Sequence, residues 1–102
     1  MIKRIHIMKH VFEWDNKKEQ ENIKKHGISF IEAKEVFYDE SRVIAVDEKH
    51  SQKEPRMFCI GNIGKGVVTV RFIYNNGAIR IFEAGYWRKG RSFYEEKNQR
   101  QK

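Results

Sequence analysis

The amino-acid sequence predicts an α+β domain, in which two N-terminal helices pack on an antiparallel sheet of about four strands, followed by a short C-terminal helix. The first half holds two segments with helix-capping signals and no internal glycine or proline. The second half mixes apolar and polar residues at strand-like spacing and contains the hairpin signal Asn76-Gly77. The 102 residues fit a single domain over 1–102, with a core over about 12–96 and an N-terminal extension over 1–11.

The chain begins with a partly alternating segment. Apolar residues recur over 5–14, which predicts a short strand. Met8 is a possible alternative start, and residues 1–7 would then be an accessory extension.

The first helix is predicted over 17–26. Asp15 or Asn16 offers an N-cap oxygen, and Gly27 suits a left-handed C-cap. The helix is nearly all polar. One of its faces carries Lys18, Asn22, Lys25 and His26, and it is either simply solvated or functional.

The second helix follows at once. The run from Ser29 to Glu32 has the pattern of a capping box. The helix ends near residues 38–40, and its apolar stripe indicates core packing. The stripe consists of Phe30, Ala33, Val36 and Phe37.

The remainder is predicted to be a strand meander with a final helix. The strands are expected over 42–46, 56–62, 67–75 and 78–84, with a polar loop over 47–55. A capping box at Ser92 predicts a helix over about 93–99, which we expect to fray because little apolar surface anchors it.

The Asn76-Gly77 turn predicts a register for the last hairpin. Counting outward, Ile73 faces Arg80, Arg71 faces Phe82, and Thr69 faces Ala84. Arg71 and Arg80 then share the more open face of the sheet, while the opposite face is apolar. Glu83 falls on the apolar face as a misfit and is expected near the end of the sheet.

Two groups of cations in this region suggest an anionic ligand. The register shows no acidic neighbour for Arg71 and Arg80, so an anion such as phosphate would fit between them. The alternative is that each arginine pairs with a carboxylate. Trp87 lies close to Arg88 and Arg91, a combination that can stack on RNA bases, unless the indole closes the core.

Composition limits the class of function. The formal net charge is +7 and 34% of residues are charged, which favours a nucleic-acid partner unless the charge serves only solubility. The single cysteine excludes a disulfide framework and suits a reducing cytoplasm. No apolar run approaches the roughly 20 residues of a membrane span. The histidines lack zinc-ligand spacing, so we expect neither metal nor cofactor.

The chain resembles the BrnT family of bacterial type II toxins. The resemblance rests on the run from Phe12 to Asp15, on Lys18 and Asn22, on the run from Lys25 to Phe30, and on Glu32-Ala33. Further matches are Arg56, Gly61, Tyr74 and Arg80-Ile81. The resemblance covers roughly residues 12–96 and implies a RelE-like fold.

The resemblance also implies an activity and a partner. It implies metal-independent RNA cleavage that halts growth, neutralised by a ribbon-helix-helix antitoxin of the BrnA type. Operator DNA would be bound only through that antitoxin. We expect the antitoxin to cover the basic, more open face and the C-terminal segment. The expected catalytic residues are His26, Lys18, Arg56 and Arg80, and the expected RNA-binding residues are Lys25, Arg71, Trp87, Arg88 and Arg91.

The sequence departs from the family after the fourth predicted strand. The family commonly reads Ser-Ala-Arg there, and this chain reads Glu83-Ala84-Gly85. An alternative function therefore stays open: a non-catalytic RNA-binding or decayed toxin, acting mainly as an antitoxin-binding module in a DNA-bound autorepressor complex.

Overall fold

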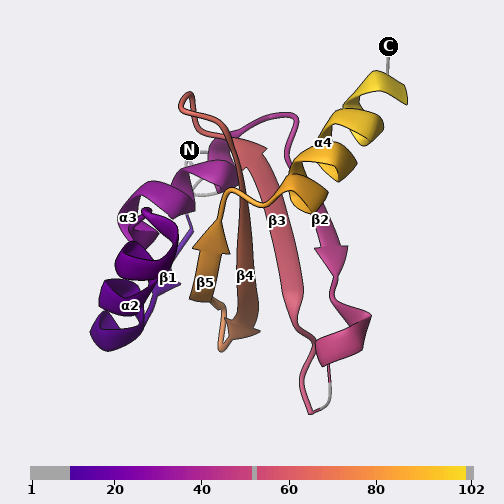
Figure 1. The fold of residues 1–102 in the computed structure, drawn as a ribbon. Helices are drawn as coiled ribbons and strands as arrows, with labels where there is room; N and C mark the ends of the chain where they lie inside the picture. The colour runs from indigo at the N-terminus through magenta and orange to yellow at the C-terminus, as the bar shows by residue number, and fades with distance from the viewer. Residues whose placement is uncertain (1–9, 52, 101–102) are drawn as a thin grey trace, which may run out of the picture.

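A five-stranded sheet forms the centre of the protein. The computed structural model describes residues 10–51 and 53–100. Its elements are β1 (Phe12–Glu13), α2 (Asn16–His26), α3 (Phe30–Ala33), η1 (Lys34–Tyr38), β2 (Val43–Val46), η2 (Glu48–His50), β3 (Met57–Asn62), β4 (Val67–Asn75), β5 (Ala78–Gly85) and α4 (Arg88–Arg100). The strand order is β1-β5-β4-β3-β2 (Figure 1).

The α+β class is confirmed, with one strand more than expected. The fifth strand of the sheet is β1, which lies in the segment predicted as a separate short strand and pairs in parallel with β5, whereas the other four strands are antiparallel. The strand predicted over 5–14 is reduced to Phe12–Glu13 within the described part of the chain, and residues 5–9 lie outside it.

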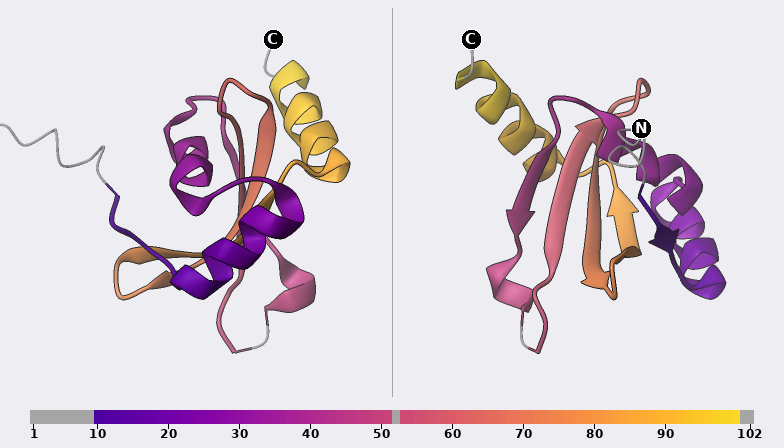
Figure 2. Two further views of the ribbon diagram at one scale, coloured as in Figure 1. Left: turned by 60° about the vertical axis from the view of Figure 1, so that its left-hand side comes forward. Right: turned by 180° about the vertical axis from the view of Figure 1, so that it is seen from behind.

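The two faces of the sheet are covered differently. Figure 2 shows α3 and η1 on one side of the sheet and α4 on the other, with α2 beside the β5 edge. The buried core lies under α3 and η1, where Phe30, Val36 and Phe37 pack against β4 residues such as Phe72. None of the helices in the described residues is long and apolar enough to span a bilayer.

Local capping explains α2. The Asp15 carboxylate accepts hydrogen bonds from the backbone N–H groups of Lys17 (2.7 Å) and Lys18 (3.3 Å), and Gly27 ends the helix with φ +69°. Asn22, which we predicted on the candidate functional face, is buried. Its amide donates to the Ala84 carbonyl (2.9 Å) and accepts from the Ala84 N–H (3.1 Å), so it fastens α2 to β5.

The second predicted helix is present, but it changes type. Ser29 and Glu32 form the expected capping box at the start of α3. After Ala33 the chain continues as the 3₁₀ helix η1 rather than as an α-helix. Gly61 allows η1 to approach β3 closely, because a Cβ there would lie 2.8 Å from the Val36 carbonyl oxygen.

The last hairpin follows the predicted register only in part. Asn76 (φ 52°) and Gly77 (φ 85°) form the expected turn, and Ile73 pairs with Arg80 as predicted. Beyond Phe72 a β-bulge shifts the pairing by one residue. Arg71 therefore faces Glu83 instead of Phe82, so the predicted pairs of Arg71 with Phe82 and of Thr69 with Ala84 are wrong.

The C-terminal helix also differs from the prediction. It starts at Arg88, not near residue 93, so Ser92 lies inside α4 and does not cap it. Tertiary contacts hold the helix on the sheet. The Tyr94 hydroxyl donates to the Asp39 carboxylate (2.6 Å), and the Asn98 amide donates to the Ser41 carbonyl (3.2 Å). We expected fraying because the sequence does not show these partners.

Candidate functional site

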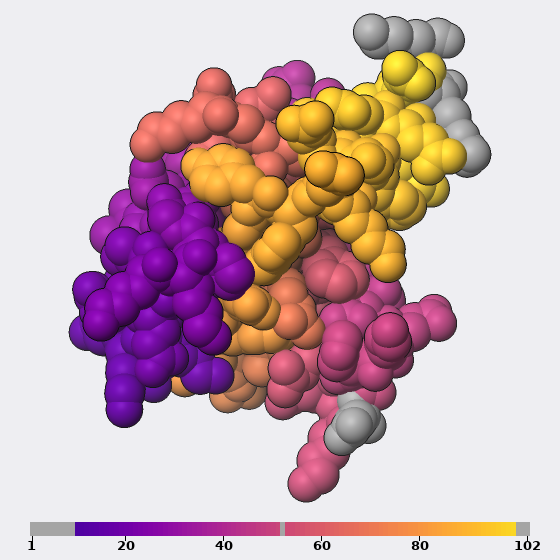
Figure 3. Space-filling view, in the orientation of Figure 1, coloured from indigo at the N-terminus to yellow at the C-terminus, as the bar shows by residue number. Residues whose placement is uncertain are grey.

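The face of the sheet opposite α3 and η1 carries the candidate site. This open face consists of Phe58, Thr69, Arg71, Ile73, Arg80, Phe82 and Glu83. At one end α4 covers Thr69, because Gly90 brings the helix backbone against that side chain. Figure 3 shows the uncovered part of the sheet at the surface between α2, α4 and the segment after β2.

A continuous chain of ionic contacts crosses this open face. His26 Nε2 lies 3.4 Å from the Glu83 carboxylate, whose other oxygen accepts a 2.7 Å hydrogen bond from Arg71. The second terminal nitrogen of Arg71 lies 3.3 Å from Asp47 Oδ2. That same oxygen lies 2.9 Å from His50 Nδ1. Two imidazoles thus stand at the ends of a carboxylate–guanidinium–carboxylate relay.

The β-bulge creates this relay. Without the extra residue, Glu83 would point to the apolar face, where the simple register placed it. The bulge at Phe82 turns the Glu83 carboxylate toward Arg71 on the open face. Because α2 ends at Gly27 and is fastened to β5, its last residue, His26, reaches the same carboxylate.

Asp47 is the most buried member of the relay. Its side chain is 6% exposed. Burial would raise the pKa of this carboxyl, but the hydrogen bond and charge of His50, together with the charge of Arg71, outweigh burial and lower the pKa. Asp47 is therefore an ionised acceptor that holds both Arg71 and His50 in place.

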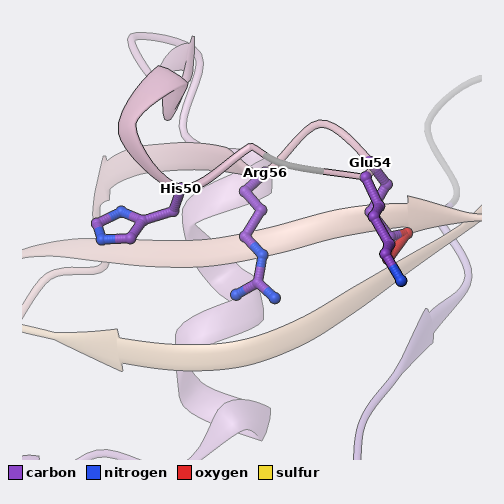
Figure 4. A pocket seen from close by; sticks show the side chains of 4 residues that line it. His50, Glu54 and Arg56 are labelled. Atoms are coloured by element: carbon purple, nitrogen blue, oxygen red, sulfur yellow. The ribbon is translucent and has the colours of Figure 1, made fainter.

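Arg56 contributes a guanidinium without a carboxylate partner among the described residues. It lies over the Phe82 ring at 4.8 Å, and Arg71 approaches the same ring at 5.2 Å. Arg56 also lines a cavity of about 320 Å³ with His50, Lys53 and Glu54. In Figure 4 the side chain of Arg56 lies between those of His50 and Glu54. This guanidinium is available for an anion.

Trp87 borders the site at the His26 end. The two rings make an edge contact with centroids 5.1 Å apart. Gly85 makes room for the indole, because a Cβ there would lie 2.7 Å from the Trp87 ring. The position where the family resemblance led us to expect an arginine therefore holds a glycine, and Trp87 occupies the space that a side chain there would need.

The expected anion site between Arg71 and Arg80 rested on a wrong premise, since both arginines have acidic partners. Arg71 contacts Glu83 and Asp47, and Arg80 donates to Glu13 at 2.8 Å. Hydrogen bonds from Asn75 and Arg80 lower the pKa of the Glu13 carboxyl. The two arginines do share the open face, as the Ile73–Arg80 pairing predicted.

The other predicted site residues surround the open face. Lys18 and Lys25 are exposed on α2. Lys18 lies about two helical turns before His26, and Lys25 directly precedes it. Arg88 and Arg91 are exposed at the start of α4, and Arg91 lies 3.7 Å from Glu95. The structure thus brings His26, Arg56 and Arg71 into one network and leaves these four cations at its margin.

Four members of the site were missed by the sequence reasoning. They are Asp47, His50, Phe82 and Glu83. The only signal for the first two was the spacing Asp47-x-x-His50 in a segment we predicted to be an irregular loop. The 3₁₀ helix η2 brings these two side chains together. Within the described residues, no group of three or more His, Cys, Asp or Glu side chains could hold a metal ion.

Comparisons with known proteins agree with this fold. A family model described as the ribonuclease toxin BrnT of type II toxin–antitoxin systems matches residues 14–90. The crystal structure of the Brucella abortus ribonuclease toxin BrnT matches with a TM-score of 0.61 and 23% sequence identity. The match covers 78% of this chain and 97% of that chain. No curated protein sequence matches.

Proposed function

The chain belongs to the BrnT family of ribonuclease toxins of type II toxin–antitoxin systems, and from this premise we propose that it cleaves RNA on its open face without a metal ion. The observation that carries the proposal is Arg56, whose guanidinium has no carboxylate partner among the described residues and lines a cavity beside His50. A guanidinium fork suits the paired oxygens of a phosphodiester.

Metal-free RNA cleavage requires two proton transfers and stabilisation of charge on phosphorus. The 2′-oxygen loses its proton and bonds to phosphorus, and the bond from phosphorus to the 5′-oxygen breaks. A proton then reaches the leaving 5′-oxygen, which yields a 2′,3′-cyclic phosphate and a 5′-hydroxyl. We assign one proton transfer to His26, an imidazole already oriented by Glu83. Arg56 stabilises the extra charge on the phosphoryl oxygens.

The cations at the margin would hold the RNA chain. We propose that Lys18, Lys25, Arg88 and Arg91 contact flanking phosphates and that Trp87 stacks on a base beside His26. Arg71 positions Asp47 and Glu83. Arg80 donates a hydrogen bond to Glu13, so it can bind a phosphate only if the phosphate displaces the Glu13 carboxylate. This revises the phosphate-clamp role that we expected for Arg80.

Membership of the family supports further proposals about the partner and the compartment. A type II system pairs its toxin with an antitoxin. We propose that the antitoxin is a ribbon-helix-helix protein of the BrnA type, that operator DNA is bound only through it, and that the toxin acts in the cytoplasm. The basic face was predicted as its docking surface because its cations were expected to be unpaired, and the carboxylate partners of Arg71 and Arg80 remove that reason.

Incubation of purified protein with bulk RNA in EDTA, without ribosomes, tests the proposal. We expect cleavage by the wild type and at least about 100-fold slower cleavage by His26→Ala. His10→Ala is a matched control, because His10 lies among Phe12, Phe37 and Tyr38, away from the relay. Cleavage that requires added magnesium, or that survives in His26→Ala, would contradict the proposal.

A non-catalytic function is the second candidate, and Gly85 favours it. The family resemblance implies an arginine at this position, and Trp87 lies where a side chain at Gly85 would be. The protein would then act mainly as an antitoxin-binding module in a DNA-bound autorepressor complex. Induced expression distinguishes the two, because only an active ribonuclease arrests growth and degrades RNA.

A further inference from the structure

RNA cleavage needs two proton transfers, of which His26 is assigned one, and a second imidazole stands at the other end of the relay. We infer that His50, held by the carboxylate of Asp47, is the second proton-transfer group of RNA cleavage. This inference rests on the proposed function and adds a residue that the family resemblance did not indicate.

The geometry of the dyad suits proton transfer. His50 Nδ1 lies 2.9 Å from Asp47 Oδ2, so this nitrogen carries a proton that it donates to the carboxylate. The same hydrogen bond orients the ring and leaves Nε2 as the nitrogen that exchanges a proton with the substrate. The His50 side chain is 54% exposed, whereas Asp47 is buried, so the imidazole is open to RNA and its orienting group is not.

A set of short hydrogen bonds fixes His50 relative to Arg56. The Asp47 N–H donates to the Arg56 carbonyl (2.7 Å), and the Ser51 hydroxyl donates to the Asp47 carbonyl (2.7 Å). That hydroxyl also accepts from the Arg56 N–H (2.8 Å). The His50 N–H donates to the Asp47 carbonyl (3.2 Å). The turn is therefore built before RNA arrives, as preorganised catalysis requires.

Arg56 places the reacting phosphate next to His50. Both side chains line the same cavity of about 320 Å³ (Figure 4). The charged groups around the imidazole are Asp47, with Arg71 behind it, and the cavity residues Arg56, Lys53 and Glu54. Because His50 and Arg56 line the same cavity, a phosphodiester bound there by Arg56 would lie beside the His50 ring. His50 then either removes the 2′-hydroxyl proton or protonates the leaving 5′-oxygen, and His26 performs the other transfer.

The experiment measures kcat/KM for a short RNA against pH, in EDTA, for the full-length wild type, His50→Ala and Lys49→Ala. We expect two titrating limbs in the wild type. His50→Ala should lose one limb and about 100-fold in rate, and added imidazole should restore part of the rate through the space left by the exposed ring. Lys49→Ala should match the wild type, because Lys49 is an exposed neighbour in η2.

Asp47→Asn tests the orienting role. This variant should have a lower kcat with a smaller change in KM. Added imidazole should not restore its rate, because the variant still contains His50. Circular dichroism confirms that each variant is folded.

The outcomes separate this inference from the proposed function. If the wild type cleaves RNA in EDTA and His26→Ala does not, but folded His50→Ala keeps both pH limbs and its rate, His50 is not a proton-transfer group. Loss of rate in His50→Ala without a changed pH profile or imidazole rescue also overturns the inference. A wild type that does not cleave RNA at all refutes the proposed function itself.

Discussion

Arg71 joins the two halves of the open face. Its guanidinium contacts Glu83 on β5 and Asp47 after β2, and its Nε is buried without a hydrogen-bond partner. The side chain is 21% exposed, so these contacts are only partly screened by water. Arg71 therefore has a structural role in the relay, whereas Arg56 keeps its charge available for a ligand.

Removing Arg71 takes the guanidinium partner from Glu83 and from the buried carboxylate of Asp47, which keeps only its contact with His50 among the ion pairs of the described residues. We predict that Arg71→Ala lowers the free energy of unfolding by about 2 kcal/mol, measured by urea denaturation. Arg80→Ala is the control. Its partner Glu13 sits in an exposed ion pair, so stability should change little. Equal stability of Arg71→Ala and wild type would show that the relay adds nothing to folding.

Arg56 and Arg80 should differ in their contributions to catalysis, because only Arg80 has a carboxylate partner among the described residues. Arg56→Ala should lower the cleavage rate by about 100-fold, because its free guanidinium stabilises the phosphoryl charge. Arg80→Ala should lower it less, because Glu13 already neutralises Arg80. Single-turnover cleavage of a labelled RNA measures both. A larger effect of Arg80→Ala would restore Arg80 as the phosphate clamp.

At the scale of elements, α4 shapes the site by covering one end of the open face. It approaches so closely because Gly90 has no side chain to collide with Thr69. The Tyr94–Asp39 hydrogen bond then fixes the helix against the chain after η1. Burial, together with the hydrogen bond and charge of Asp39, raises the pKa of Tyr94 to about 12, and its hydroxyl is the donor to Asp39.

We predict that Gly90→Ala changes the stability of the protein in the direction opposite to that expected from helix propensity. In a free helix this change stabilises by about 1 kcal/mol. Here the new methyl group meets Thr69, so we predict a loss of about 1–2 kcal/mol in unfolding free energy. The loss should largely disappear in a Thr69→Ala background. A stabilised Gly90→Ala protein would mean that α4 does not pack against Thr69.

Elements that depend on local signals could be predicted, and those that depend on distant partners could not. The caps at Asp15 and Ser29 and the Asn76-Gly77 turn lie within a few residues of what they stabilise. The packing of α4 on the sheet depends instead on Gly90 meeting Thr69, and the parallel pairing of the strand predicted over 5–14 depends on β5.

The same distinction explains the site. His26 and Arg56 could be named from residue chemistry and family resemblance. The relay from His26 to His50 could not be predicted, because it requires the bulge at Phe82 and the turn at Asp47. Both are properties of packing and not of residue spacing.

At the scale of the whole molecule, the net charge of +7 coexists with strongly paired carboxylates. Burial would raise the pKa of Asp39, but hydrogen bonds from Asn62, Tyr94 and Ser41 lower it. Burial would likewise raise the pKa of Asp47, but His50 and Arg71 lower it. Asp39 links the segment after η1 to β3 and α4, and Asp47 links the segment after β2 to β4, so ionisation of these carboxylates supports the fold as a unit.

Acid should therefore destabilise the protein. Both carboxyls bind protons less readily when folded than when unfolded, so their stabilisation is present above their ordinary pKa of about 4 and is lost as pH falls through the lower folded values. Urea denaturation between about pH 3 and 7 measures the loss. The Asp39→Asn and Asp47→Asn double variant should be less stable at neutral pH and show a shallower decline. An unchanged decline would assign acid sensitivity to other groups.

The chemical ends of the RNA fragments test the open-face mechanism most directly. Cleavage by histidines and a guanidinium proceeds through the 2′-hydroxyl, so fragments made by the wild-type protein in EDTA should carry 2′,3′-cyclic phosphates and 5′-hydroxyls. Mass spectrometry of a short defined RNA identifies these ends. Fragments with 3′-hydroxyl and 5′-phosphate ends would contradict the mechanism, because water rather than the 2′-hydroxyl would then have attacked phosphorus.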